Sequence, residues 1–147
     1  MFSGKTEELI RRINIAKLAK YRTIVFKPNI DTRNKGNYIT SHDNNKLKAT
    51  SVIDENEILN KAKKYHIIGI DEAQFFSISL VDICNNLANS GKRIIVAGLD
   101  MDFKGRPFGP MPNLMATAEF VSKLHAICAK SGKMANYTHR KSKDKKT

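Results

Sequence analysis

The chain has 147 residues, of which 41% are hydrophobic and 27% charged, and this balance suits one globular domain with a buried core. No apolar run approaches the roughly 20 residues that cross a membrane, and charged residues interrupt the N-terminal stretch, so neither a membrane span nor a secretory signal is predicted. Two cysteines, Cys84 and Cys128, are too few for a disulfide framework, and we therefore expect a reducing, cytoplasmic location.

The net charge of +12 is unevenly distributed along the chain. From residue 130 to the end, seven Lys or Arg residues stand against Asp144 alone, so this tail supplies +6. A basic chain attracts phosphate groups, whether on nucleotides or on nucleic acid. Tyr137 is the one aromatic residue of the tail that would stack on bases, so we expect a nucleotide ligand rather than a nucleic-acid surface.

Apolar runs rich in β-branched residues alternate with stretches of helical periodicity. The predicted elements are a helix over 5–20, a strand over 23–28, a loop over 29–45, a helix over 54–65, a strand over 66–71, a helix over 79–92, a strand over 93–100, a helix over 113–120 and a fourth strand over 121–128. This alternation predicts an α/β fold with a parallel sheet covered on both faces. Ligands of such folds bind at the carboxyl ends of the strands.

The segment SGKT, residues 3–6, matches the last part of the phosphate-binding loop G-x-x-x-x-G-K-[ST]. Lys5 would contact the outer phosphates of a nucleotide, and Thr6 would ligate Mg²⁺. An ordinary helix start, with Ser3 or Thr6 as its cap, is the alternative.

Two adjacent carboxylates, Asp71 and Glu72, follow the predicted strand over 66–71. An acid at the tip of such a strand is placed to serve nucleotide-bound Mg²⁺, and Asp71 takes that position. Strand alternation would turn Glu72 to the other side, where it could accept a proton from an attacking hydroxyl or water. A solvated strand end is the simpler alternative.

The segment GLDMDFKGRPFG, residues 98–109, follows the strand over 93–100 and combines acids, a cation and aromatic rings. Arg106 could touch a phosphate, and Phe103 and Phe108 could form the walls of a pocket for a planar ring. A surface loop anchored by buried phenylalanines is equally compatible with this composition.

Five segments, MFSGKTEELIRR, FKPNIDTR, IGIDEAQFF, GLDMDFKGRPFGP and ANYTHR, occur in this order between Met1 and Arg140. In order and spacing they resemble the type II thymidine kinases, cytosolic deoxynucleoside kinases with a zinc-bearing substrate lid. The resemblance implies a P-loop, RecA-like parallel sheet flanked by helices. It also implies ATP-dependent phosphorylation of the 5′-hydroxyl of thymidine to give dTMP, a step of pyrimidine salvage.

The resemblance assigns roles residue by residue. The ATP and Mg²⁺ site would comprise Ser3, Gly4, Lys5, Thr6, Asp31, Arg33, Asp71 and Gln74, with Thr6 and Asp71 on the metal. Glu72 would be the catalytic base. The thymidine site would comprise Met1, Phe75, Leu99, Phe103, Thr138 and Arg140, with Phe75 stacked on the base.

The sequence departs from the family pattern at both ends. The first glycine of the phosphate loop and the strand that leads into it are missing before Met1, and Ser131 stands where a second cysteine would pair with Cys128. We therefore expect a kinase domain over 1–128 without its first strand, and a remnant of the lid over 129–147. Cys128 would remain as a weak ligand of a zinc site that is lost. Either the start codon lies upstream, or the gene is eroded and the chain inactive.

Three functions remain open at this point. The first is a thymidine kinase that uses ATP and Mg²⁺ and, by resemblance, assembles as a homotetramer. The second is another P-loop ATPase, because an acidic pair also activates water for hydrolysis. The third is a non-catalytic basic remnant that binds nucleotides or nucleic acid. Dependence of ATP consumption on thymidine separates the first from the second.

Overall fold

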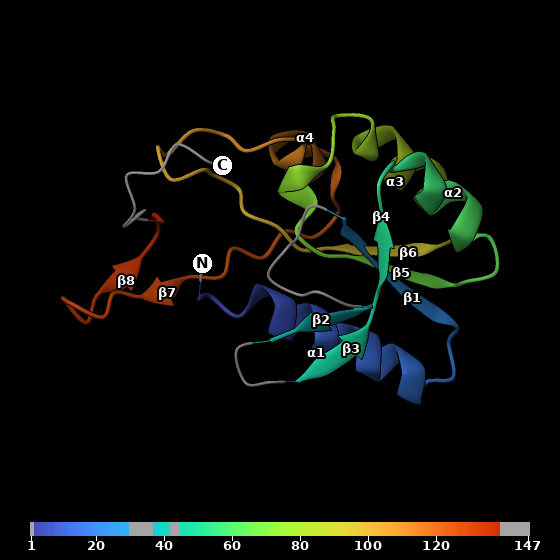
Figure 1. Cartoon of the computed structure of the whole chain (residues 1–147), viewed down its shortest axis with the longest axis horizontal. Coiled ribbons are helices and arrows are strands. Elements are labelled where there is room, and N and C mark those ends of the chain that lie inside the picture. The colour runs from blue at the N-terminus through green and yellow to red at the C-terminus, as the bar shows by residue number, and fades with distance from the viewer. Residues whose placement is uncertain (1, 30–36, 42–44, 139–147) are drawn as a thin grey trace.

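A parallel sheet of four strands forms the centre of the molecule. The computed structural model describes residues 2–29, 37–41 and 45–138 (Figure 1). The strands lie in the order β4-β1-β5-β6, and every neighbouring pair is parallel. Their bounds are β1 Thr23–Pro28, β4 Thr50–Val52, β5 Ile67–Ile70 and β6 Arg93–Val96. The predicted α/β fold with a parallel sheet is confirmed.

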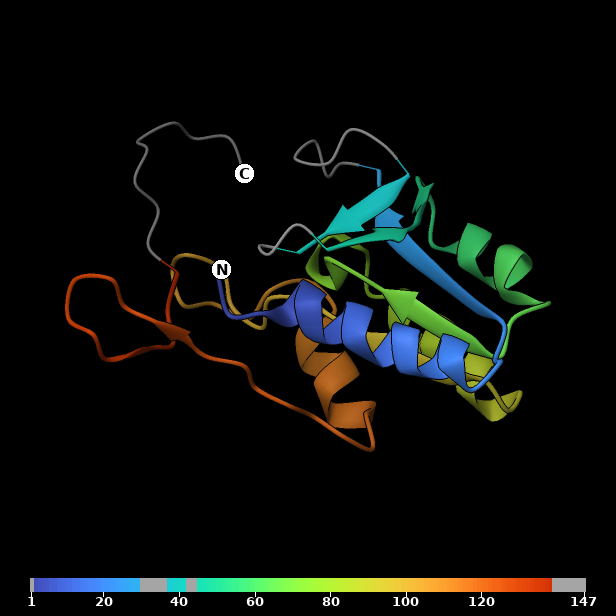
Figure 2. The same cartoon turned by 90° about the horizontal axis from the view of Figure 1, so that it is seen from below.

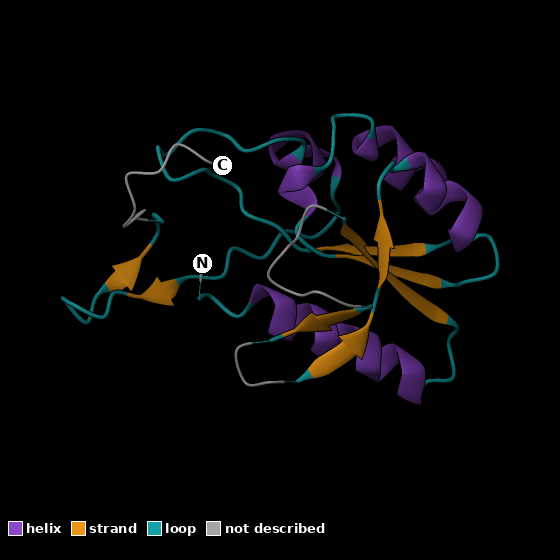
Figure 3. Cartoon of the chain, viewed as in Figure 1, coloured by secondary structure: helices purple, strands orange, loops and turns teal. Residues whose placement is uncertain are grey.

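Helices cover both faces of this sheet, as Figure 3 shows. Helix α1 and the small hairpin β2–β3 pack on one face, whereas α2, α3 and α4 pack on the other. Their bounds are α1 Lys5–Leu18, β2 Tyr38–Thr40, β3 Lys46–Lys48, α2 Asn56–Ala62, α3 Leu80–Asn89 and α4 Met111–Thr117. Among the described residues, none of the helices combines the length and the apolar character that a bilayer crossing requires.

Strand alternation divides the buried side chains between the two faces. Val25 packs with α1, and the next residue, Phe26, packs with α2 and α3. Gly69 on β5 lets α1 approach the sheet closely, because a Cβ at that position would lie 3.2 Å from Leu9 Cδ1 and 3.3 Å from Ile13 Cδ1. The helix that follows the phosphate-loop residues is therefore held directly against the strand that ends at Asp71.

Three parts of the sequence differ from the expected pattern. No element is predicted over 46–53, yet β3 and the sheet strand β4 form there. The stretch predicted as a loop over 29–45 contains β2, whose buried Ile39 packs with Leu47 of β3. The predicted strand over 121–128 is wrong for most of its length, since only β7 (Ala126–Ile127) forms there, paired with β8 (Met134–Ala135). The apolar residues of this stretch are poorly buried, and Val121 remains 48% exposed. A strand within a sheet would pack such side chains against its neighbours.

The β7–β8 hairpin lies apart from the three layers, on the side toward which the start of α1 points (Figure 2). It begins before residue 128 and continues beyond it, so the hairpin crosses the predicted boundary between the two parts of the chain. The division into 1–128 and 129–147 remains a prediction.

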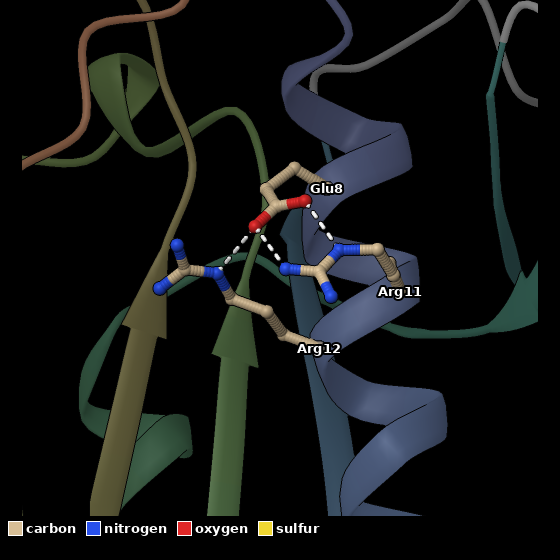
Figure 4. Close-up of polar contacts among 3 residues, drawn as sticks. All are labelled: Glu8, Arg11 and Arg12. Atoms are coloured by element: carbon tan, nitrogen blue, oxygen red, sulfur yellow. Dashed lines mark hydrogen bonds and ion pairs between the residues drawn. The ribbon is translucent and has the colours of Figure 1, made fainter.

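Helix α1 carries an ion-pair cluster on its surface (Figure 4). Glu8 accepts hydrogen bonds from Arg11 Nε at 2.7 Å, Arg11 Nη2 at 2.8 Å and Arg12 Nε at 2.8 Å. The side chains are three and four residues apart, which brings them together on one helical face. The hydrogen bonds from Arg11, and then those from Arg12, lower the pKa of Glu8 from its ordinary 4.5 to about 2.

This shift predicts a pH-dependent contribution of Glu8 to stability. Because the folded-state pKa lies below the unfolded-state value, the contribution is present above pH 4.5 and is lost as the pH falls toward 2. The cluster lies at the surface, with the Glu8 side chain 28% and the Arg11 side chain 59% exposed, so Glu8→Gln should lower the free energy of unfolding at pH 7 by only about 0.5–1 kcal/mol. Urea unfolding of both proteins at pH 7, 4 and 3 should show the difference shrinking at acid pH. A difference that is constant across this range would contradict the shift.

Candidate active site

Residues 3–6 form the start of α1 and a turn suited to anions. Gly4 is the N-cap with φ 76°, a left-handed conformation that glycine adopts without strain. No side chain of the described residues caps this helix, so the alternative with Ser3 or Thr6 as cap is wrong. Instead, Lys5 Nζ donates to Ser3 Oγ at 3.0 Å. The NH groups of a helix start, together with a lysine, favour phosphate oxygens.

Thr6 joins this turn to the end of β5. Its hydroxyl Oγ1 donates to Asp71, lying 3.2 Å from Oδ2 and 3.4 Å from Oδ1. Asp71 is 5% exposed, and its own NH donates to Phe26 O at 2.9 Å, which holds it at the carboxyl end of β5. The two residues predicted to serve Mg²⁺ thus lie together although 65 positions separate them in sequence.

The donor atoms of this pair fit magnesium. One carboxylate and one hydroxyl supply hard oxygen ligands, and Mg²⁺ commonly completes its shell with phosphate oxygens and water. Among the described residues no group of three or more His, Cys, Asp and Glu side chains is arranged to hold a metal ion. Thr6 and Asp71 therefore fit a metal that arrives with a nucleotide, rather than one held by a cage of protein ligands.

Glu72 leaves the strand in a turn. Its φ of 51° is left-handed, which is uncommon for a residue with a side chain, and its NH donates to Asp71 Oδ1 at 3.0 Å. It precedes the 3₁₀ helix η1, Ala73–Phe75. The turn, and not strand alternation, sets the direction of the Glu72 side chain. Non-glycine residues in such conformations are frequent at functional sites.

Gln74 and Phe75 bring the second carboxylate next to the loop after β6. Gln74 Nε2 donates to Glu72 Oε2 at 2.5 Å, and Gln74 Oε1 accepts from Leu99 N at 3.0 Å. The rings of Phe75 and Phe108 meet edge to face with centroids 5.5 Å apart. Gln74 thereby connects two residues predicted for the site, Glu72 and Leu99, and the ring of the next residue, Phe75, packs on Phe108.

The loop over 100–108 is a tight turn organised by Asp102. Asp102 Oδ1 accepts from Lys104 N at 2.8 Å and from Arg106 N at 3.0 Å. These backbone hydrogen bonds, that of Arg106 first, lower the pKa of Asp102. The Arg106 side chain is exposed, and Phe103 is 45% exposed with Lys104 Nζ 5.6 Å from its ring centroid. A pocket with Phe103 and Phe108 as its walls remains a prediction.

The C-terminal segment returns to this loop. A Cβ on Gly105 would lie 3.4 Å from Tyr137 Cε1, so the residue before Thr138 packs on the turn. The predicted site residues Met1, Asp31, Arg33 and Arg140 lie outside the described residues. Cys128 is part of the β7–β8 turn, where a hydrogen bond with the Ser131 side chain is the main cause that lowers its pKa. Its role toward zinc stays a prediction.

One buried charged residue was missed by sequence reasoning. Lys27 is 1% exposed, and its Nζ donates to Tyr38 O at 3.1 Å, which ties the β2–β3 hairpin to β1. It follows Phe26, the register partner of Ile70, so it lies across from Asp71 at the carboxyl ends of the strands. A lysine that ends an apolar strand directly before a proline was the available signal.

Together these features define a nucleotide-binding α/β protein of the P-loop type. A glycine turn opens α1, a threonine on that helix contacts an aspartate at a strand end, and a second carboxylate follows at once. All of these groups lie at the carboxyl ends of parallel strands, where ligands of such sheets bind.

Comparison with known proteins agrees with this class. The family described as Thymidine kinase matches residues 1–147. A thymidine kinase of Bacteroides fragilis is 55% identical over 146 residues, which cover 99% of this chain and 73% of that protein. Thymidine kinases of Rhodothermus sp. and Porphyromonas gingivalis are 55% and 48% identical, over 95% and 96% of this chain and 66% and 69% of those proteins. The chain belongs to the thymidine kinase family.

Proposed function

We propose that the chain transfers the γ-phosphoryl group of ATP to the 5′-hydroxyl of thymidine. The observation that carries this proposal is the contact of Thr6 with Asp71 at 3.2 Å, directly beside Glu72. It supports the proposal because it brings the residues proposed for phosphate binding, for Mg²⁺ and for the base together at the carboxyl ends of the strands. The relatives compared above, which cover nearly the whole chain, are named thymidine kinases, and this supports the same substrate pair.

Binding and orientation of ATP would fall to the start of α1. The NH groups of residues 3–6 and the Lys5 ammonium would hold the phosphates, and Asp31 and Arg33 would lie beside them. Thr6 and Asp71 would hold Mg²⁺, which neutralises charge on the phosphates when bound. Because the protein does little covalent chemistry in phosphoryl transfer, this positioning and charge stabilisation supply most of the rate enhancement.

Thymidine would lie between η1 and the loop after β6. Phe75 would stack on the thymine ring, with Phe108 supporting Phe75 from the side. Leu99, Phe103 and the segment at Thr138 would line the same pocket, together with Met1 and Arg140. Glu72 would accept the proton of the 5′-hydroxyl as the oxygen attacks the γ-phosphorus.

Three further properties belong to this proposal. We place the chain in the cytoplasm, where thymidine is phosphorylated for nucleotide salvage, and infer a homotetramer from the family resemblance. Membranes and nucleic acid are not among the proposed partners. Zinc would be held weakly, since Cys128 is paired with Ser131 rather than with a second thiolate and a serine hydroxyl is a poor zinc ligand.

The decisive assay measures ADP and dTMP formation by the purified chain with ATP and Mg²⁺, with and without thymidine. The proposal predicts ADP formation that requires thymidine and matches dTMP in amount. Equal ADP formation without thymidine would instead identify an ATPase. Failure to bind ATP, combined with RNA binding that weakens steeply with salt, would identify a basic remnant.

A further inference from the structure

Gln74 lies between the candidate base and the loop after β6, and both ends of its carboxamide are engaged. Its side chain is buried, with 2% exposure. Nε2 donates to Glu72 Oε2 at 2.5 Å, and Oε1 accepts from Leu99 N at 3.0 Å. The residue therefore connects η1, the base and the strand end across 25 positions of sequence.

The orientation of this amide follows from its partners. A backbone NH can only donate, so the group of Gln74 that faces Leu99 N must be the oxygen. The NH₂ group must then face the Glu72 carboxylate, which accepts it. The flipped amide would set an NH₂ against an NH and an oxygen against a carboxylate. Two independent contacts thus select the same orientation, and the donor to Glu72 is fixed.

Close packing holds Gln74 in place from two sides. A Cβ on Gly98 would lie 3.0 Å from Gln74 Oε1, and a Cβ on Gly109 would lie 2.3 Å from Gln74 O. Both glycines therefore let the loop after β6 approach closer than any other residue would permit. The side chain and the main chain of Gln74 are enclosed, so its amide has little freedom to swing away from Glu72.

We propose that Gln74 is a positioning residue that aims the Glu72 carboxylate and fixes it relative to Leu99. This inference rests on the proposed kinase function, in which Glu72 is the base. The resemblance groups Gln74 with the ATP site. Its side chain, however, contacts Glu72, the proposed base, and Leu99, which is proposed to line the thymidine pocket. By holding one carboxylate oxygen, the amide sets the rotation of the group that must meet the 5′-hydroxyl.

Two substitutions test these hydrogen bonds. Gln74→Met removes both at similar volume, whereas Gln74→Asn keeps a carboxamide that is one methylene too short to span Leu99 N and Glu72. Both variants should lower kcat about 10- to 100-fold, the range expected when a reacting group is displaced by about 1 Å. KM for ATP should stay near the wild-type value. Ser90→Ala, which removes a hydrogen bond to Leu87 O at the far end of α3, is the control and should keep wild-type kcat.

A double-mutant cycle with Glu72→Gln tests whether Gln74 acts through the base. Once the base is gone, adding Gln74→Met or Gln74→Asn should lower the residual rate no further. Melting curves identify any variant that does not fold, and Gln74→Asn carries the test if Gln74→Met unfolds, because it keeps a polar carboxamide in the buried site.

The outcomes separate the inference from the function on which it rests. A wild-type chain without thymidine-dependent turnover would overturn the proposed function. Where that turnover is present, an equal loss in the presence and absence of Glu72 would overturn the positioning role alone. A rise in KM for ATP with kcat unchanged would also overturn it, and would return Gln74 to the ATP site.

Discussion

Replacing Glu72 by glutamine is expected to lower thymidine phosphorylation about 10²- to 10⁴-fold, the usual contribution of a general base. Glutamine has the same shape but does not accept the proton of the 5′-hydroxyl. The residue follows Asp71, and its backbone donates to the Asp71 carboxylate at 3.0 Å, so the proposed base lies next to a proposed Mg²⁺ ligand. ATP binding should be retained because the phosphate-loop residues and the Thr6–Asp71 contact are untouched.

Two measurements test this result. Single-turnover formation of dTMP reports the chemical step, and titration with a fluorescent ATP analogue reports nucleotide binding. Glu119→Gln is the matched control, since Glu119 is an exposed carboxylate after α4 and the same chemical change there should leave turnover intact. Wild-type turnover in the Glu72 variant would remove this residue from the role of base.

The core of this site could be predicted because it depends on local signals. A buried apolar run ending at Asp71 marks a strand tip, and GKT before a helix marks a phosphate turn. Both Thr6 and Asp71 are assigned to nucleotide-bound Mg²⁺, and the structure places Thr6 Oγ1 3.2 Å from Asp71 Oδ2. Strands β1, β5 and β6 follow from their apolar, β-branched runs, whereas β4 is too short to give such a signal and was not predicted.

Features that depend on long-range packing escaped prediction. The hairpin β2–β3 lies in a polar stretch, and only Ile39 and Leu47 contribute its buried side chains, too few for a periodic signal. The run over 121–128 has strand composition, yet no neighbour covers Val121, which stays half exposed. The family resemblance assigns Gln74 to the ATP site, and only the fold shows that its oxygen meets Leu99 N.

The second large effect is expected from Gly109→Ala. Gly109 has φ 51°, and an added Cβ would lie 2.3 Å from the main-chain oxygen of Gln74. Gly91, after α3, is the matched control, because it has φ 81° and nothing lies within 4 Å of its added Cβ. Both changes carry the cost of a left-handed alanine, about 1–2 kcal/mol. In Gly109→Ala the new methyl group also pushes against the main chain of Gln74, which should lower the free energy of unfolding by a further amount of about 1–3 kcal/mol.

Urea unfolding of the two alanine variants therefore measures the steric contact with the conformational cost removed. The difference in free energy of unfolding between them should be about 1–3 kcal/mol, with Gly109→Ala the less stable. Turnover should separate the variants further, because the atom that must yield belongs to Gln74, which holds Glu72 by a hydrogen bond at 2.5 Å. Gly91→Ala, at the opposite end of the sheet, should keep wild-type turnover at temperatures where it is folded. Equal stability and equal turnover of the two variants would show that the loop after β6 does not press on Gln74. In that case close packing would not be what holds the Gln74 amide against Glu72.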